Sequence, residues 1–286
     1  MKTLHPEILI GAGHGLRFTE SPRWHEERWW FLDIHDSAIK AVTMDGTLET
    51  ILSLPFKPNG FGFRPDGGML FSDALNLRMM YWDGTVLHPY ADLSSISVFC
   101  LSDGIVDANG RMFIGDIGYN FWDASAKPSD NCAITRIDPD AGVHKVADGL
   151  SFPNGMAITP DGGTLVVAET NGFCLTAFDL SPQGDLSNRR IFAALGEGVQ
   201  PDGICMDQAG GIWIANPAAE QGKAPGVLRV EEGGRVTHGI TLDTHAYAVM
   251  LGGPEQRHLF ISTSASHDPA EIAVTPSAAL YICAID

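Results

Sequence analysis

Residues 64–73 of this chain read RPDGGMLFSD, a tight turn rich in Asp and Gly followed by an apolar stretch that ends on an acidic residue. Five other segments repeat this pattern: WHEERWWFLDI from Trp24, DANGRMFIGD from Asp107, TPDGGTLVVAE from Thr159, MDQAGGIWIAN from Met206 and GGPEQRHLFISTS from Gly252. The repeats end at Asp33, Asp73, Asp116, Glu169, Asn216 and Thr263, so successive copies lie 40 to 53 positions apart. A period of this length with strand-type patterning is typical of propeller blades. The chain is therefore predicted to be all-β, a six-bladed β-propeller.

A second motif opens each repeat and consists of a polar residue, a Gly or small residue, and an apolar strand, as in Pro153-Asn154-Gly155 and Pro201-Asp202-Gly203. The innermost strand of a blade starts near the axis, so equivalent positions of the blades are expected to converge at one channel mouth. The residues expected there are Glu20, Asn59, Asp103, Asn154 and Asp202. Residues 7–10 are expected to pair with a last strand at residues 280–285, closing the ring and removing an exposed sheet edge.

Length and charge limit the classes of protein to which the chain could belong. Its 286 residues suit one closed all-β domain, and no linker-like tract interrupts them, so we expect a single domain over residues 1–286. The net charge of −17, from 35 acidic and 18 basic residues, argues against nucleic acid and anionic membranes as partners. The expected partner is a small-molecule substrate, and the sequence leaves the oligomeric state open.

The five cysteines bear on the cellular compartment. Their number is odd and no CxxC pair occurs, and most lie in or beside apolar strand-like runs where a thiol packs as a small hydrophobe. The N-terminal residues contain no long apolar stretch typical of a signal peptide. We therefore expect a reducing, cytoplasmic location.

Glu20, Asn154 and Asp202 are candidate metal ligands, because carboxylate and amide oxygens are hard donors suited to divalent cations. An alternative reading is that these residues only form turns, since Asn-Gly and Asp-Gly are common turn formers. Glu20 favours the metal site, because Glu has no turn role in that position and a charge near a closed axis needs a partner.

Several motifs resemble, in the same order, those of the SMP-30/gluconolactonase/LRE family: Glu20-Ser21-Pro22-Arg23-Trp24, Asp103-Gly104-Ile105-Val106-Asp107 followed by Gly110-Arg111, Pro153-Asn154-Gly155 and Pro201-Asp202-Gly203. The resemblance covers nearly the whole chain. It implies a six-bladed propeller with one divalent cation, Ca²⁺, Zn²⁺, Mn²⁺ or Mg²⁺, held by Glu20, Asn154 and Asp202. It also implies that Asp202 acts in proton transfer and that the reaction is hydrolysis of a lactone ring.

The chain departs from the sugar-lactone members at positions that grip polyols. Sugar-lactone members resemble one another in having an Arg, an Asn and a carboxylate at three such positions. This chain has Cys100, Ser102 and Asn120 there, in that order. The aromatic residues Phe99, Tyr119, Phe121 and Trp122 lie nearby, so we expect a substrate less polar than a sugar lactone, although loop packing explains Phe121 and Trp122 equally well. The expected substrate-binding residues are Ser102, Cys100, Asn120, Asn59, Trp122 and His245.

The sequence therefore predicts a divalent-metal-dependent hydrolase of the lactonase or esterase type, with Asp202 as the catalytic acid/base. A second possibility keeps the metal pocket but changes the reaction to that of an isomerase, a cyclase or an arylesterase, since one fold hosts many chemistries. A third is a propeller that binds a partner without catalysis.

Overall fold

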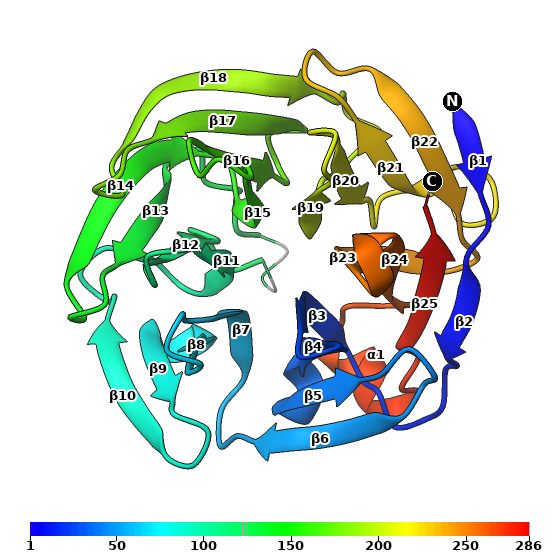
Figure 1. Ribbon diagram of the computed structural model, residues 1–286, viewed down its shortest axis with the longest axis horizontal. Coiled ribbons are helices and arrows are strands. Elements are labelled where there is room, and N and C mark those ends of the chain that lie inside the picture. The colour runs from blue at the N-terminus through cyan, green and yellow to red at the C-terminus, as the bar shows by residue number, and fades with distance from the viewer. Residues whose placement is uncertain (122, 124, 286) are drawn as a thin grey trace. The chain divides into compact units, whose positions relative to one another are not determined.

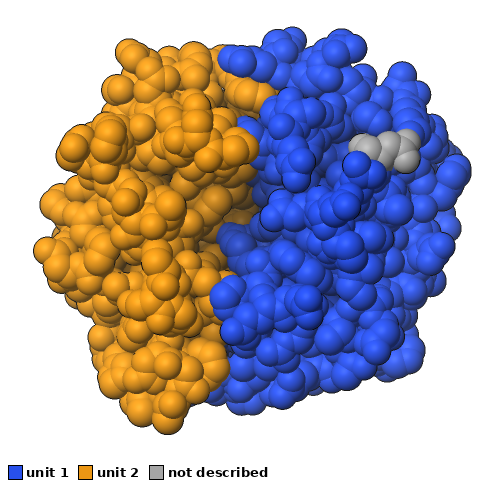
Figure 2. All heavy atoms as spheres, viewed as in Figure 1, with its two compact units in different colours: residues 1–58, 195–286 blue, residues 59–194 orange. Residues whose placement is uncertain are grey.

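The computed structural model describes residues 1–121, 123 and 125–285. The chain divides into two compact units, which Figure 2 colours separately. Unit 1 comprises Met1–Pro58 and Leu195–Asp286, and unit 2 comprises Asn59–Ala194. Each unit is built almost entirely of antiparallel strands joined by short turns.

Unit 1 contains three sheets in which consecutive strands of the chain are neighbours, except that the first two strands of the chain each join a sheet of later strands (Figure 1). The first sheet is β3 (Thr19–His25), β4 (Arg28–Asp33), β5 (Ala38–Val42) and β6 (Leu48–Ser53). The second is β19 (Ile204–Met206), β20 (Ile212–Ala215), β21 (Pro225–Val230) and β22 (Val236–Thr241), extended by β1 (Lys2–Leu4), which runs parallel to β22. The third is β23 (His245–Gly252), β24 (His258–Ser264), β25 (Ala279–Ala284) and β2 (Glu7–Ile10).

Unit 2 also contains three sheets of four strands. They are β7 (Pro58–Phe63), β8 (Met69–Asp73), β9 (Arg78–Trp82) and β10 (Leu87–Asp92); β11 (Leu101–Val106), β12 (Met112–Asp116), β13 (Cys132–Ile137) and β14 (Val143–Leu150); and β15 (Pro153–Ile158), β16 (Thr164–Glu169), β17 (Cys174–Leu180) and β18 (Leu186–Ala194).

The fold class is that of a six-bladed β-propeller, as the repeats predicted. Each repeated apolar stretch forms the second strand of a sheet, and each polar opening motif lies at the start of a first strand. The predicted pairing of residues 7–10 with the last strand is confirmed, because Glu7 lies opposite Ile282 and Ile10 opposite Leu280. An edge of the third sheet of unit 1 is thus covered by a strand from the other end of the chain.

Helical structure is minor in the described residues: the single-turn helices η1 (Ile34–Asp36), η2 (Ala74–Asn76) and η3 (Pro254–Gln256), and the short helix α1 (Pro269–Val274). Asp268 caps α1 by accepting a hydrogen bond from the Ala270 N–H. No helix in the described part of the chain is long and apolar enough to cross a membrane.

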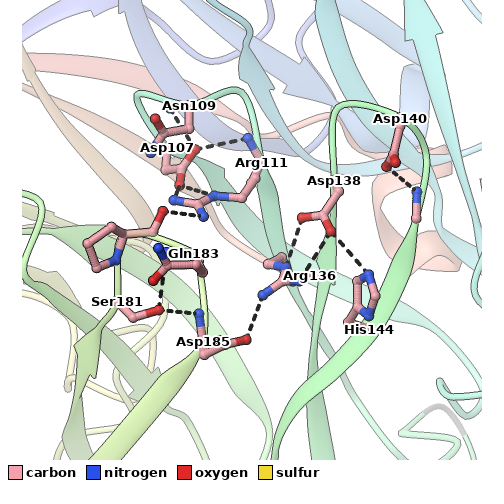
Figure 3. A network of polar contacts seen from close by, with 12 residues as sticks. Asp107, Asn109, Arg111, Arg136, Asp138, Asp140, His144, Ser181, Gln183 and Asp185 are labelled. Atoms are coloured by element: carbon pink, nitrogen blue, oxygen red, sulfur yellow. Dashed lines mark hydrogen bonds and ion pairs between the residues drawn. The ribbon is translucent and has the colours of Figure 1, made fainter.

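Apolar side chains fill the space between neighbouring sheets of the same unit. In unit 2, Phe113 and Leu150 pack against Met156 and Leu165 of the following sheet. A polar network joins the same two sheets at their turns (Figure 3). Arg111 pairs with Asp107 and donates to the Pro182 carbonyl oxygen at 2.9 Å. These contacts fix the sheets that carry Asp103 and Asn154.

Candidate active site

The predicted site residues lie where the first strand of a sheet begins, and a β-bulge interrupts three of these strands there. The register between first and second strands shifts between Glu20 and Arg23, between Leu101 and Gly104, and between Pro153 and Met156. A bulge leaves a residue outside the ladder and redirects its side chain. The bulges therefore free the side chains at Ser102, Asp103 and Asn154 from the ordinary alternation of the strand, and Glu20 directly precedes the first bulge.

A local hydrogen bond holds several of these side chains, with the next backbone N–H as donor. The bonds are Ser21 N–H to Glu20 Oε2 at 3.0 Å, Gly60 N–H to Asn59 Oδ1 at 3.0 Å, and Gly104 N–H to Asp103 Oδ1 at 2.8 Å. Ser21 has φ = 50°, in the left-handed region that non-glycine residues seldom occupy. Such strain persists only where the surroundings impose it and clusters at functional sites.

The polar residues that end four of the repeats hold the backbone that leads to the candidate site. Their side chains accept hydrogen bonds from the backbone just before the first strand: Asp33 from Phe18 at 2.9 Å, Asp116 from Val98 at 3.2 Å, Glu169 from Ser151 at 2.8 Å, and Asn216 from Gln200 at 3.0 Å. The segments held in this way lead directly to Glu20, Ser102, Asn154 and Asp202. The repeat ends thus position the candidate site residues.

In unit 1, Glu20 and Asp202 act on one phenol. Both are buried, at 7% and 9% exposure. Burial raises the pKa of Tyr247, and the negative charges of Asp202 and Glu20 raise it further. Two carboxylates far apart in sequence therefore exert their charge on the same hydroxyl group. No sequence motif predicted a role for Tyr247, which adjoins Gly203 because the Gly203 N–H donates to the Tyr247 carbonyl oxygen at 2.8 Å.

His245, a predicted substrate-binding residue, lies at the start of β23, two residues before Tyr247. The two rings have centroids 6.5 Å apart and meet edge to face. The Nδ1 atom of His245 is buried and has no hydrogen-bond partner among the described residues. The structure thus places His245 beside the phenol that the two carboxylates influence.

In unit 2, Asn154 lies between two hydroxyl groups. Its Oδ1 accepts from Ser102 Oγ at 3.4 Å, and its Nδ2 donates to Thr170 Oγ1 at 3.2 Å. Asn59 Nδ2 donates to the carbonyl oxygen of Leu101, next to Ser102, at 3.2 Å. Three predicted residues, Asn59, Ser102 and Asn154, therefore gather at one place. The hydroxyl of Thr170 directs the amide oxygen of Asn154 away from itself.

The remaining predicted substrate-binding residues form a less polar neighbourhood. Cys100 is buried, and burial raises the pKa of its thiol to about 12, so it stays neutral. Phe99 and Phe121 meet edge to face, with ring centroids 6.1 Å apart, and pack against the same apolar cluster as Cys100. Asn120 is exposed at the start of the following loop. Trp122 lies outside the described residues.

The donor set fits a divalent cation by its chemistry. Two buried carboxylates whose charges act on one phenol favour a bound cation, because a nearby positive charge stabilises the ionised form of a carboxyl group. Glu20 and Asp202 of unit 1 supply hard oxygen donors of the kind that Ca²⁺ and Mg²⁺ prefer, and the amide of Asn154 in unit 2 is a donor of the same kind. No group of three or more His, Cys, Asp and Glu side chains suited to a metal occurs among the described residues, and the candidate set differs because one of its members is an amide.

Comparison with known proteins gives a family match. The sequence model of the SMP-30/Gluconolactonase/LRE-like region matches residues 18–265, which include every predicted site residue.

Named relatives and solved structures agree with this match. The chain is 27% identical to 6-deoxy-6-sulfogluconolactonase of Pseudomonas putida over 88% of this chain and 85% of that protein. It is 27% identical to pentonolactonase XacC of Haloferax volcanii over 87% of this chain and 82% of that protein. The crystal structure of regucalcin from Agrobacterium tumefaciens, described as a calcium-binding protein, has a TM-score of 0.79 at 19% identity and covers 100% of this chain and 96% of its own.

Proposed function

The chain belongs to the SMP-30/gluconolactonase/LRE-like family, and on that premise we propose that it is a lactonase, a hydrolase that opens a cyclic ester with the help of one divalent cation. The similarity to a sulfogluconolactonase and a pentonolactonase over more than four fifths of each chain supports this class of reaction. The substrate is a small molecule.

One observation carries the proposal beyond the family. Glu20 and Asp202 come from separate sheets of unit 1 and are both buried, and their charges act on the same Tyr247 hydroxyl group. Residues that only form turns would not require two buried carboxylates from separate sheets to act on one hydroxyl group. This arrangement favours a site that binds a cation over the alternative in which the polar residues only form turns.

Each residue has a distinct role in the proposed reaction. Glu20, Asn154 and Asp202 would hold the cation, which when bound polarises the ring carbonyl. Asp202 would also accept a proton at its carboxylate from the attacking water and return it to the leaving alkoxide, a form of help worth roughly 10²–10⁴-fold in rate. Tyr247 would stay protonated beside them, because burial and the two carboxylates raise its pKa. The calcium-binding relative supports Ca²⁺ among the four candidate ions.

We further propose that the lactone carries fewer hydroxyl groups than a sugar lactone. Cys100 is neutral and buried, and Ser102 already donates to Asn154. Neither side chain offers the charge or reach needed to grip several substrate hydroxyl groups. Asn59, Asn120, Trp122 and His245 complete the proposed substrate-binding set.

The proposed location is cytoplasmic. The five cysteines are free thiols in the structure, and four of them are buried. A reducing compartment keeps such thiols unpaired.

The direct test is lactone hydrolysis by the purified protein, followed by proton release and product identification, before and after chelation. We expect activity to disappear with the cation and to return with one of Ca²⁺, Zn²⁺, Mn²⁺ or Mg²⁺. Glu20→Gln, Asn154→Ala and Asp202→Asn should each abolish turnover. Asp161→Asn is a matched control, because Asp161 only accepts hydrogen bonds within an exposed turn.

The outcomes separate the competing functions. Full activity in all three variants would place the site elsewhere. A product isomeric with the substrate would replace hydrolysis with a non-hydrolytic reaction in the same pocket. Absence of both turnover and bound cation would favour a binding module without catalysis.

A further inference from the structure

A lysine and a histidine in unit 1 form a pair that the proposed mechanism does not use. Lys57 follows β6, and its Nζ lies 2.9 Å from Nδ1 of His35 in η1. His35 Nε2 lies 3.4 Å from the carbonyl oxygen of His267. With Nε2–H donating to that carbonyl, Nδ1 is the lone-pair nitrogen that accepts from the ammonium group.

The histidine is a neutral partner for this ammonium group. Burial lowers the pKa of His35 to about 4, and the nearby charge of Lys57 contributes to the shift. Burial also lowers the pKa of Lys57. The imidazole therefore orients the ammonium group without cancelling its charge.

Lys57 differs from the buried cations in the described part of the chain in having no carboxylate partner. Lys40, Arg111, Arg136 and Arg229 each pair with at least one carboxylate at 2.8 Å or less. Lys57 is half-buried, and within the described ranges no carboxylate forms an ion pair with it. In a chain with 35 acidic and 18 basic residues, a carboxylate partner was available in excess. An ammonium group has three N–H donors, and His35 uses one of them.

Ring contacts link this pair to the carboxylates of the proposed site. The rings of His35 and Phe18 have centroids 5.3 Å apart, and those of Phe18 and Tyr247 are 4.8 Å apart. Tyr247 is the phenol on which Glu20 and Asp202 act. The ring of Phe18 thus lies between His35, which holds the Lys57 ammonium group, and the phenol of Tyr247. All of these residues belong to unit 1.

We propose that Lys57, oriented by His35, binds an anionic substituent, a carboxylate, on the substrate at a position remote from its lactone ring. This inference rests on the proposed lactonase function and specifies its substrate class: an apolar or aromatic lactone with one carboxylate arm. Phe18 contacts the apolar part between the two ends. Lys57 is a specificity-determining residue and takes no part in bond breaking.

The test compares two lactones that differ only in charge, a five-membered lactone bearing a carboxylate arm and the same lactone bearing a carboxamide. We expect the protein to prefer the carboxylate form. Lys57→Met should lower kcat/KM for that form at least tenfold, because a charge-assisted hydrogen bond is worth roughly this factor or more. It should change kcat/KM for the carboxamide less than twofold, and Lys57→Arg should retain part of the preference.

Lys145→Met is the matched control, because Lys145 is an exposed lysine of β14 that pairs with Asp148, and both substrates should be unaffected. Thermal unfolding of each variant checks that it is folded, and Lys57→Gln serves in place of Lys57→Met should the latter not fold. An equal loss for both substrates, or a wild-type protein without preference for the carboxylate, would overturn the proposal.

Should the wild-type protein open neither lactone, the lactonase function fails and the anion site is tested by itself. Calorimetric titration with glutarate then compares wild type with Lys57→Met. Binding to wild type that is lost in the variant supports the site, and equal binding to both, or binding to neither, refutes it.

Discussion

Removing the Asp33 carboxylate should destabilise the protein far more than removing the neighbouring carboxylate of Asp36. Asp33 is fully buried, accepts the Phe18 N–H at 2.9 Å, and pairs with Lys40 at 2.8 Å, whose side chain is 6% exposed. Asp36 pairs with the same Lys40 at 2.7 Å, but its side chain is 38% exposed. The two carboxylates share one cation and differ in burial.

The expected magnitudes follow from that difference. Breaking a buried ion pair by deleting one partner costs about 3–5 kcal/mol, from a typical total stability of about 5–15 kcal/mol. Solvent screens the Asp36 pair, so Asp36→Ala should cost under about 1 kcal/mol. Asp33→Asn should fall between the two, because the amide oxygen still accepts the Phe18 N–H while the charge opposite Lys40 is lost.

Urea unfolding followed by tryptophan fluorescence measures these free energies. The dependence of the free energy on urea concentration should remain that of the wild type, so that the midpoint shift reports stability alone. Asp33→Ala should also lower lactone hydrolysis by the folded protein, because Phe18 leads directly to Glu20. An Asp33→Ala variant as stable as Asp36→Ala would refute the role given to the repeat-end carboxylates.

Three other predictions concern the site geometry, the alkaline limit and the domain count. An added methyl group at Gly104 would lie 2.3 Å from the Phe113 carbonyl oxygen, so Gly104→Ala should reduce both thermal stability and lactone hydrolysis, whereas Gly198→Ala, which meets open space, should change neither. Burial works to lower the pKa of Lys40, but hydrogen bonds to Asp33 and Asp36 outweigh it and the pKa is raised. Protonated Lys40 therefore contributes its full stabilisation below the unfolded lysine pKa of roughly 10.4, and this contribution disappears as the pH rises through the folded pKa. In urea titrations at alkaline pH, the stability of Lys40→Met should accordingly fall less steeply with pH than that of the wild type. Parallel curves for the two proteins would contradict this. A single domain over residues 1–286 should unfold in one calorimetric transition with equal calorimetric and van't Hoff enthalpies, and two separated transitions would show that the two units unfold independently.

The repeats were sufficient to predict the fold class, because a turn with a following apolar strand is a local pattern. RPDGGMLFSD contains both its turn and the buried strand β8 within ten letters. The fourth strand of each sheet gave a weaker pattern: β6 mixes exposed and half-buried residues, and its sequence has no continuous apolar run.

The site was only partly predictable, because much of it depends on contacts across the fold. Glu20 was identified by its charge, but the positive φ of Ser21 beside it is imposed by the bulge and is not encoded by a glycine. The sequence indicated only that Glu169 ends a strand. Its carboxylate accepts a hydrogen bond from the Ser151 N–H only when β15 and β16 pair. Tyr247 gave no signal, because only the topology brings it near Glu20 and Asp202.

The pairing of β2 with β25 has a consequence during synthesis of the protein. Residues 7–10 leave the ribosome long before their partner at residues 279–284 is made. Until then, β2 and the unfinished sheet both present open hydrogen-bonding edges, which invite association with other nascent chains. Contacts this distant in sequence also form slowly. Chaperone capacity and the speed of translation between these two segments should therefore influence the yield of native protein.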